Sequence, residues 1–452
     1  MTFHSINPYS KESIGSFRAW QEKEISNTLQ QVAASVKYWK ETSVRDRLHH
    51  VSTIKFKLLN EKQNLARLIT TEMGKPIAEA MAEIEKCAWL CDYYIEQCEE
   101  WLKPQQEKLS DKTVWHSLQP IGAVLGIMPW NYPFWQVFRY AIPNLLAGNI
   151  VLLKHAPNTM ACAEALQNLF SGNNSSSFFH LPIDVTQVEQ VVAHPVVQGV
   201  CLTGSVNAGR AVASLAGKYV KKSVMELGSA DAFVILPDAQ FEMALSAAFT
   251  SRMLNAGQTC IAAKRIFIEA NKVDDAIAFF TEKIKAIRLG NPLEEQTQMG
   301  PISKLEFVNK LRKQVEQATQ QGARLVEGAQ AKDNFFLPGI LLADAEHPMH
   351  TEELFGPVLT LIPYKKEERL LDLINNNPFG LAASVWSSNV EKAFSFSRKI
   401  EAGTVVINDF MKSDPRIPFG GVKLSGYGRE MGKQGFISFL NEKAIIVPRK
   451  LE

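Results

Sequence analysis

The chain has 452 residues, which is long for one small core and predicts two or three domains. Its 49 basic and 47 acidic side chains give a formal net charge of +2, so charge offers no reason to expect nucleic acid or an anionic membrane as a partner. No apolar run is long enough to span a bilayer, and the N-terminus lacks the pattern of a signal peptide. The six cysteines show no disulfide spacing, so we expect a cytoplasmic, reduced protein.

The first hundred residues have a helical pattern. Apolar residues recur at three- and four-residue spacing over 43–76 and again over 76–102. The second segment carries Cys87, Cys91 and Cys98 on roughly one face. Because it has neither CxxC pairs nor nearby histidines, we expect these cysteines to pack in a core, and we predict no metal site.

Strands alternate with helices beyond residue 113. Strand-like segments lie within 113–133, 149–158, 197–217 and 221–236, and this alternation predicts a doubly wound parallel sheet. After Pro237 the alternation resumes to about Asn408 and predicts a second α/β unit. The tail ends in an apolar strand with an unprotected edge, which predicts a partner subunit.

The stretch "NAGQTCIAAKR" places Cys260 directly behind a turn. A free cysteine there is either a small buried hydrophobe or a nucleophile, and this stretch alone fits both. Upstream, "MPWNYPFWQVFRY" sets Asn131 among aromatics and prolines. A rigid side-chain amide of this kind is a good oxyanion donor, although it also suits an Asn that holds its own turn. Arg139, among apolar residues, needs an anionic partner if it is buried.

Three further residues stand at the ends of predicted strands, where α/β sheets bind ligands. Ser205, in "LTGSVNAGR", begins a helix whose free amides favour a phosphate, although a plain tight turn fits as well. Lys154 can bond ribose hydroxyls or be a solvated loop lysine. Glu226, in "VMELGSAD", can be a general base if burial raises its pKa, or a surface carboxylate. Together these groups form the set that a covalent mechanism with a dinucleotide requires.

The motifs "PWNYP", "LLKHAPN", "LTGS", "MELGS", "GQTC", "EELFGPV" and "PFGGVKLSGYGRE" occur in an order that resembles the NAD(P)-dependent aldehyde dehydrogenase superfamily. The chain most resembles its short bacterial succinate semialdehyde dehydrogenases. The resemblance implies an α/β fold with a Rossmann-like dinucleotide-binding domain (1–101 and 121–227). It also implies an α/β catalytic domain (228–424) and a small β oligomerisation element (102–120 and 425–452), used in a homodimer or homotetramer.

The resemblance also implies roles for individual residues. Cys260 is the nucleophile, Asn131 and the Cys260 backbone N–H form the oxyanion hole, and Glu226 activates the hydrolytic water. The expected cofactor-binding residues are Met128, Pro129, Trp130, Lys154, His155, Ala156, Gly204, Ser205, Leu227, Glu353 and Phe355. Pro157 stands where many NAD-preferring members carry an acidic residue, so both NAD and NADP are expected as cofactors, with a lean to NAD.

The implied substrate is a small aldehyde, most closely succinate semialdehyde, which carries a carboxylate opposite its aldehyde. Arg139 matches a position that binds this carboxylate in related enzymes. A second arginine that those relatives place six residues before the cysteine is Leu254 here, and we expect Arg416 or Ser413 to compensate. A second departure is Ser229, where the family has a second glycine.

Alternatives remain open at this level. The chain is also consistent with a broad-specificity aldehyde dehydrogenase, or with an inactive relative that has a binding role. The presence of Cys260, Asn131 and Glu226 counts against the inactive relative. A cysteine hydrolase would need a histidine base near Cys260, and the nine histidines show no such motif.

Overall fold

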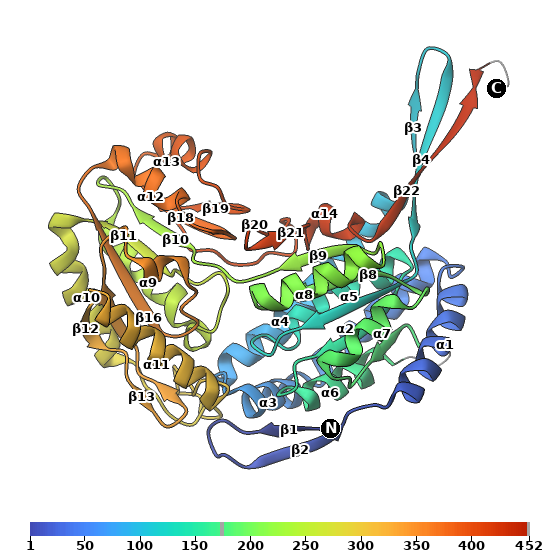
Figure 1. Ribbon diagram of the computed structural model, residues 1–452. Coiled ribbons are helices and arrows are strands. Elements are labelled where there is room, and N and C mark those ends of the chain that lie inside the picture. The colour runs from blue at the N-terminus through green and yellow to red at the C-terminus, as the bar shows by residue number, and fades with distance from the viewer. Residues whose placement is uncertain (172–175, 450–452) are drawn as a thin grey trace.

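The computed structural model describes residues 1–171 and 176–449. It has two α/β lobes side by side and a narrow β arm that projects from the first lobe (Figure 1). Within the described ranges, no helix is long and apolar enough to cross a membrane.

The first lobe is built on a six-stranded sheet in the order β21-β9-β8-β5-β6-β7. Its strands are parallel except β21, which runs antiparallel to β9. The strand order reverses between the neighbours β5 and β8, the place where doubly wound sheets bind ligands. The strands are β5 (Ala123–Met128), β6 (Ile150–His155), β7 (Phe178–His180), β8 (Val197–Thr203), β9 (Lys222–Glu226) and β21 (Gly426–Tyr427).

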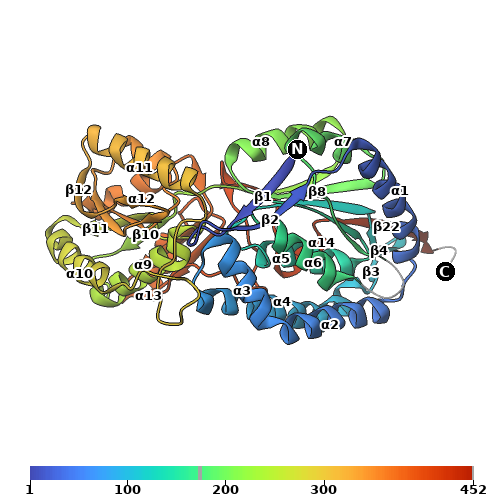
Figure 2. The same ribbon diagram turned by 90° about the horizontal axis from the view of Figure 1, so that it is seen from below.

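Helices cover both faces of this sheet, with α1, α7 and α8 on one side and α2 to α6 on the other (Figure 2). Cys87, Cys91 and Cys98 on α4 are fully buried in the core of the second side, which confirms their predicted packing. The helices are α1 (Glu22–Trp39), α2 (Val44–Asn60), α3 (Lys62–Met73), α4 (Ile77–Leu102), α5 (Trp135–Ala147), α6 (Met160–Phe170), α7 (Val188–Ala193), α8 (Val206–Lys218) and α14 (Gly432–Ile437).

The N-terminus differs from the all-helical expectation, because β1 (Thr2–Ile6) and β2 (Ser13–Arg18) form an antiparallel hairpin. Phe3 and Ser5 of β1 point inward, and Phe3 packs with Ala19 and with Met160 of α6. Period-2 alternation over five residues is too short a signal to stand out beside the long helical segments.

The second lobe has a seven-stranded sheet in the order β12-β15-β16-β11-β10-β18-β19, parallel except for the β12–β15 pair. The predicted second α/β unit is therefore present. Its strands are β10 (Ala232–Ile235), β11 (Arg265–Glu269), β12 (Arg324–Gly328), β15 (Gly339–Leu342), β16 (Val358–Tyr364), β18 (Ala382–Trp386) and β19 (Thr404–Ile407). Its helices are α9 (Phe241–Met253), α10 (Val273–Ala286), α11 (Leu305–Gln320), α12 (Leu370–Asn375) and α13 (Val390–Ser397). Short two-stranded ribbons pair β13 (Ala331–Lys332) with β14 (Phe335–Phe336) and β17 (Phe379–Gly380) with β20 (Val422–Lys423).

The arm is a three-stranded sheet of β3 (Gln105–Lys108), β4 (Lys112–Pro120) and β22 (Leu440–Pro448), with β4 in the centre. The expected oligomerisation element began at residue 425. However, β21 extends the sheet of the first lobe and α14 packs on α5, so only the last strand of that segment belongs to the arm.

Candidate active site

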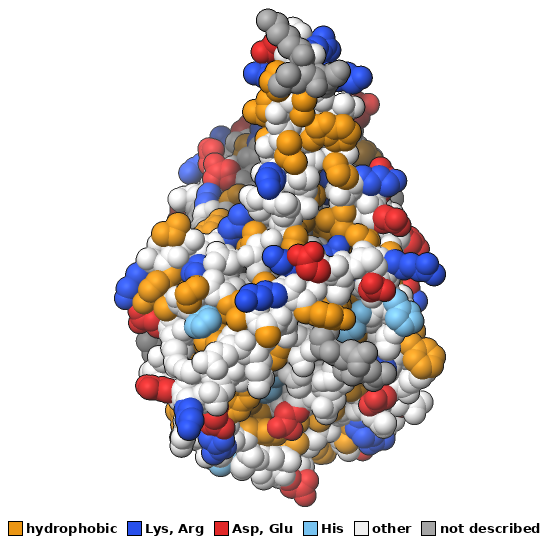
Figure 3. All heavy atoms as spheres, turned by 90° about the vertical axis from the view of Figure 1, so that its right-hand side faces the viewer, with side chains coloured by type: hydrophobic (Ala, Val, Ile, Leu, Met, Phe, Trp, Pro, Cys, Tyr) orange, Lys and Arg blue, Asp and Glu red, His pale blue; other side chains and the backbone are white. Residues whose placement is uncertain are grey.

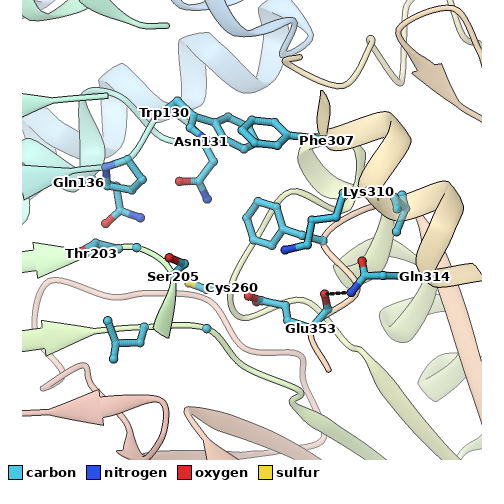
Figure 4. A pocket seen from close by; sticks show the side chains of 16 residues that line it. Trp130, Asn131, Gln136, Thr203, Ser205, Cys260, Phe307, Lys310, Gln314 and Glu353 are labelled. Carbon is cyan, nitrogen blue, oxygen red and sulfur yellow. Dashed lines mark hydrogen bonds between the residues drawn. The ribbon is translucent and has the colours of Figure 1, made fainter. Parts of the chain in front are cut away.

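Two pockets meet at Cys260. The first lies between the strand ends of the first lobe and helix α11 of the second (Figure 4). The second lies between α4, α5 and the segment 410–413. Cys260 and Gln136 line both, so the thiol stands where a molecule in one pocket would meet a molecule in the other.

A tight backbone turn presents Cys260. Helix α9 ends at Met253, and Asn255, Ala256 and Gly257 then take left-handed conformations with φ of 52°, 52° and 72°. A Cβ on Gly257 would lie 2.2 Å from the backbone oxygen of Gly356, so both the φ and the space require glycine there.

Asn131 is fixed beside this turn. Its side-chain Nδ2 donates to the backbone oxygen of Gln258 at 2.9 Å, and Asn255 Nδ2 donates to the backbone oxygen of Asn131 at 2.8 Å. An amide nitrogen carries two hydrogens, so one N–H remains for a substrate oxygen. Asn131 lines the first pocket together with Cys260, which fits the predicted oxyanion donor.

The electrostatics around Cys260 favour the neutral thiol. Burial raises the pKa of Cys260 to about 12, and the cations Lys264 and Arg139 oppose that shift. Lys264 and the Ser229 hydroxyl both donate to the Cys260 backbone oxygen, Ser229 at 2.6 Å. Lys264 also pairs with Glu353 at 3.1 Å. Ser229, in the family's glycine position, also donates its backbone N–H to Glu353 Oε1 at 3.2 Å, so it joins the backbone of Cys260 to a carboxylate of the first pocket.

Glu226 ends β9, and its buried carboxyl lines neither pocket but lies within the electrostatic influence of the Arg139–Glu430 ion pair. A Cβ on Gly420 would lie 2.6 Å from Glu226 Oε1, so glycine leaves room for the carboxyl. Burial, reinforced by the charge of Glu430, raises the pKa of Glu226 well above its usual range, while Arg139 and Arg429 oppose the shift. A raised pKa suits a general base, but the side chain must turn toward the thiol to act as one.

The first pocket has the features of a dinucleotide cleft. It lies at the carboxyl ends of β5, β8 and β9, beside the point where the strand order reverses. Ser205 caps helix α8 and accepts from the amide of Ala208 at 3.3 Å, and this helix N-terminus faces the cleft. Several of the predicted cofactor residues line it, namely Pro129, Trp130, Gly204, Ser205, Leu227, Glu353 and Phe355.

The remaining predicted cofactor residues lie just outside that lining. Met128 is the last residue of β5, and Lys154 is buried near the end of β6, where burial lowers its pKa. The His155 ring contacts the Pro133 backbone oxygen at 3.0 Å and accepts from the Ala156 amide at 2.8 Å. Burial lowers the pKa of His155 to about 4, so His155 is a neutral structural residue whose ring is already engaged.

The structure also shows cleft residues that carry no sequence signal. Phe307 stacks on Trp130 with ring centroids 4.9 Å apart, and this stack joins the two lobes (Figure 4). Lys310 and Gln314 follow on the same face of α11, and Gln314 donates to the Glu353 backbone oxygen at 3.2 Å. Their helix has an ordinary amphipathic pattern, which does not reveal which polar residues face a ligand.

In the second pocket the predicted carboxylate-binding residues have different surroundings. Arg139 lines the pocket, but its Nε donates to Glu430 at 2.6 Å and its guanidinium is ion-paired with that carboxylate. Arg416 lies outside the lining, is exposed and pairs with Asp414 at 2.7 Å, so the structure does not bring it to this pocket. Ser413 is buried and lines the pocket, which is compatible with its predicted contact with the substrate.

The profile of the "Aldehyde dehydrogenase family" matches residues 1–445. The chain is 38% identical to the "Probable succinate-semialdehyde dehydrogenase [NADP(+)]" of Synechocystis sp., over 98% of this chain and 99% of that one. It is 37% identical to the "Succinate semialdehyde dehydrogenase [NAD(P)+] Sad" of Escherichia coli, over 98% of this chain and 97% of that one.

Among solved structures, the succinic semialdehyde dehydrogenase of Streptococcus pyogenes in complex with NADP+ is 33% identical and has a TM-score of 0.96. The match covers 99% of this chain and 100% of that one. With the ordered motifs, the shared fold and the two pockets that meet at Cys260, these similarities show that the chain belongs to the aldehyde dehydrogenase family.

Proposed function

We propose that this NAD(P)-dependent aldehyde dehydrogenase oxidises succinate semialdehyde to succinate. The observation that carries the proposal is the full-length similarity to relatives named for this reaction, at 37% and 38% identity. The presence of a second pocket beside Cys260, separate from the dinucleotide cleft, supports it.

In this reaction Cys260 attacks the aldehyde carbon as a thiolate. The free N–H of Asn131 and the Cys260 backbone N–H stabilise the oxyanion that forms, and one such donor is typically worth ~3–4 kcal/mol. Bound NAD(P) supplies the acceptor for the hydride that leaves the aldehyde carbon. The acyl group remains on Cys260 as a thioester. Glu226, once turned toward the thiol, deprotonates the water that releases the acid.

We further propose that NADP is accepted at least as well as NAD. The lean to NAD has no support among the relatives, since the Synechocystis relative is named for NADP and the Escherichia coli relative for both cofactors. Pro157 is exposed beside the end of β6 and places no carboxylate there to repel a 2′-phosphate.

We also propose at least a homodimer formed through the arm. Trp115, Ile445 and Ile446 are exposed apolar residues on its strands, and hydrophobic side chains gather there (Figure 3). β22 is an edge strand, which a second copy could extend. A monomeric mass in light scattering at micromolar concentration would refute this assignment.

The test of the function is the absorbance of reduced nicotinamide when purified protein is mixed with succinate semialdehyde and either NADP or NAD. Cys260→Ala is the control and should abolish turnover. Turnover with butanal as efficient as with succinate semialdehyde would indicate a broad-specificity enzyme instead. Absence of turnover with any aldehyde would indicate an inactive relative.

A further inference from the structure

The second pocket needs a cation if the substrate carries a carboxylate opposite its aldehyde. Position 254, six residues before Cys260, is a leucine that lines the pocket. Arg139 is ion-paired with Glu430, and Arg416 is paired with Asp414 outside the lining. Therefore none of these three positions provides a cation that is free of a carboxylate partner.

Two nearby lysines are also committed to carboxylates. Lys412 lines the pocket, and its Nζ lies 3.0 Å from both oxygens of Asp409. Lys75 is buried in an ion pair with Glu83, whose other oxygen accepts from the backbone amide of Phe134 at 2.9 Å. These charges are already neutralised by their partners.

Lys86 differs from them. It lies on α4, lines the pocket and forms no ion pair within the part of the chain that the structure describes. Its Nζ donates to Ser413 Oγ at 2.7 Å and lies 4.6 Å from the centroid of the Trp135 ring. An ammonium has three donors, so this single hydrogen bond leaves two N–H groups for a ligand.

Four ionisable groups lie near enough to Lys86 to act on its pKa. Arg139 on α5 disfavours its protonated form, while Cys87 and Glu83 on α4 and Asp414 in the facing segment favour it. Burial is the largest influence, and together these groups lower the pKa of Lys86 to about 8. A partly desolvated ammonium without a carboxylate partner gains most when an anionic ligand arrives.

We propose that Lys86, with the Ser413 hydroxyl beside it, binds the distal carboxylate of the substrate. This inference rests on the proposed function, because it assumes a semialdehyde substrate. The aromatic rings of Tyr132, Trp135 and Phe419 line the pocket and suit the methylene chain between the carboxylate and the aldehyde. Glu79 is a carboxylate residue that also lines the pocket. It lies seven residues before Lys86 on α4, about 10 Å along the helix axis, so it stands at a different part of the pocket from Lys86.

The test compares kcat/KM for succinate semialdehyde with kcat/KM for butanal, which has the same chain length and no carboxylate. In Lys86→Gln the ratio of the two values should fall about 10- to 100-fold, as expected when a hydrogen bond to a charged group is lost. Lys86→Arg keeps the charge and should retain most of the ratio. Lys412→Gln, at a lysine of the same pocket that is already paired, is the matched control and should leave the ratio near the parent value.

The pH dependence of this ratio distinguishes a lysine that binds the substrate from one that only supports the fold, because a structural lysine would not affect it. In the parent enzyme the ratio should fall as the pH rises through about 8, because Lys86 loses its proton. In Lys86→Arg the ratio should stay flat over this range, since the guanidinium remains charged.

The outcomes separate the two proposals. A parent enzyme without preference for succinate semialdehyde over butanal overturns the proposed function, and the role of Lys86 with it. A parent enzyme with that preference, combined with an unchanged ratio in Lys86→Gln, overturns only the role of Lys86. Equal losses in Lys86→Gln and Lys86→Arg, or an equal loss in Lys412→Gln, also contradict it, because the charge at Lys86 would not be the cause.

Discussion

Cofactor-free enzyme should react slowly with iodoacetamide at neutral pH, and the rate should rise about tenfold with each pH unit. The reason is that the thiolate is the reactive form, and burial raises the pKa of the Cys260 thiol to about 12. Lys264 and Arg139 favour the thiolate but do not outweigh the loss of solvent. The experiment therefore varies only the pH and uses the protein without any substitution.

The size of the effect follows from the pKa. At pH 7 a thiol of pKa about 12 is ionised to ~10⁻⁵, against ~10⁻² for a thiol at the usual value of 9.0. A more basic thiolate is also a better nucleophile, and a Brønsted slope of ~0.45 recovers about 20-fold of that thousandfold difference. Cys260 should thus react about 50-fold more slowly at pH 7 than a free cysteine.

The assay is alkylation of the cofactor-free protein between pH 7 and 10, with the modified peptide identified by mass spectrometry. The other cysteines are buried, and burial raises the pKa of each thiol, so label should accumulate at Cys260 and disappear in Cys260→Ser. A rate that reaches a plateau below about pH 9 would show that the thiol is activated without the cofactor and would refute the reasoning.

Three substitutions test the remaining roles. Asn131→Ala should lower kcat about 10²- to 10³-fold with little change in KM, measured by steady-state kinetics beside a melting curve, because one oxyanion donor is lost. Glu226→Gln should release one equivalent of reduced cofactor per active site and then stall in a stopped-flow trace, whereas the parent's deacylation rate should rise with pH because its base has a raised pKa. Pro157→Glu should raise KM for NADP about tenfold or more and KM for NAD much less, since a carboxylate would repel only the 2′-phosphate. Normal turnover in Glu226→Gln, or equal changes for both cofactors in Pro157→Glu, would contradict the assigned roles.

Most of the cleft residues that could be predicted lie in short motifs at strand ends. Trp130 follows β5, Ser205 follows β8 and Leu227 follows β9, and all three strand ends meet at the same edge of one sheet. A local pattern of strand, turn and helix is enough to place such residues, because the parallel arrangement brings their ends together.

Two cleft residues of helix α11 in the second lobe could not be found in this way. Phe307 and Gln314 lie on α11. Only the packing of that lobe against the first brings Phe307 to Trp130, and only the folding of the second lobe brings Gln314 to Glu353. Lys86 also could not be predicted from the sequence pattern. It lies on a long helix whose pattern predicts which face is buried but not which side chain borders a pocket.

Arg139 shows how elementary chemistry and family resemblance can point to different partners. A buried guanidinium needs an anion, and the structure provides Glu430, which lies 291 residues away in the chain. This pair stands beside Glu226, so its charges act on the pKa of the base. Removing Arg139 would leave Glu430 buried and unpaired, at a cost of roughly 3–5 kcal/mol. Loss of activity in Arg139→Ala would therefore not identify a carboxylate-binding residue, whereas the ratio of two substrates in Lys86 variants does.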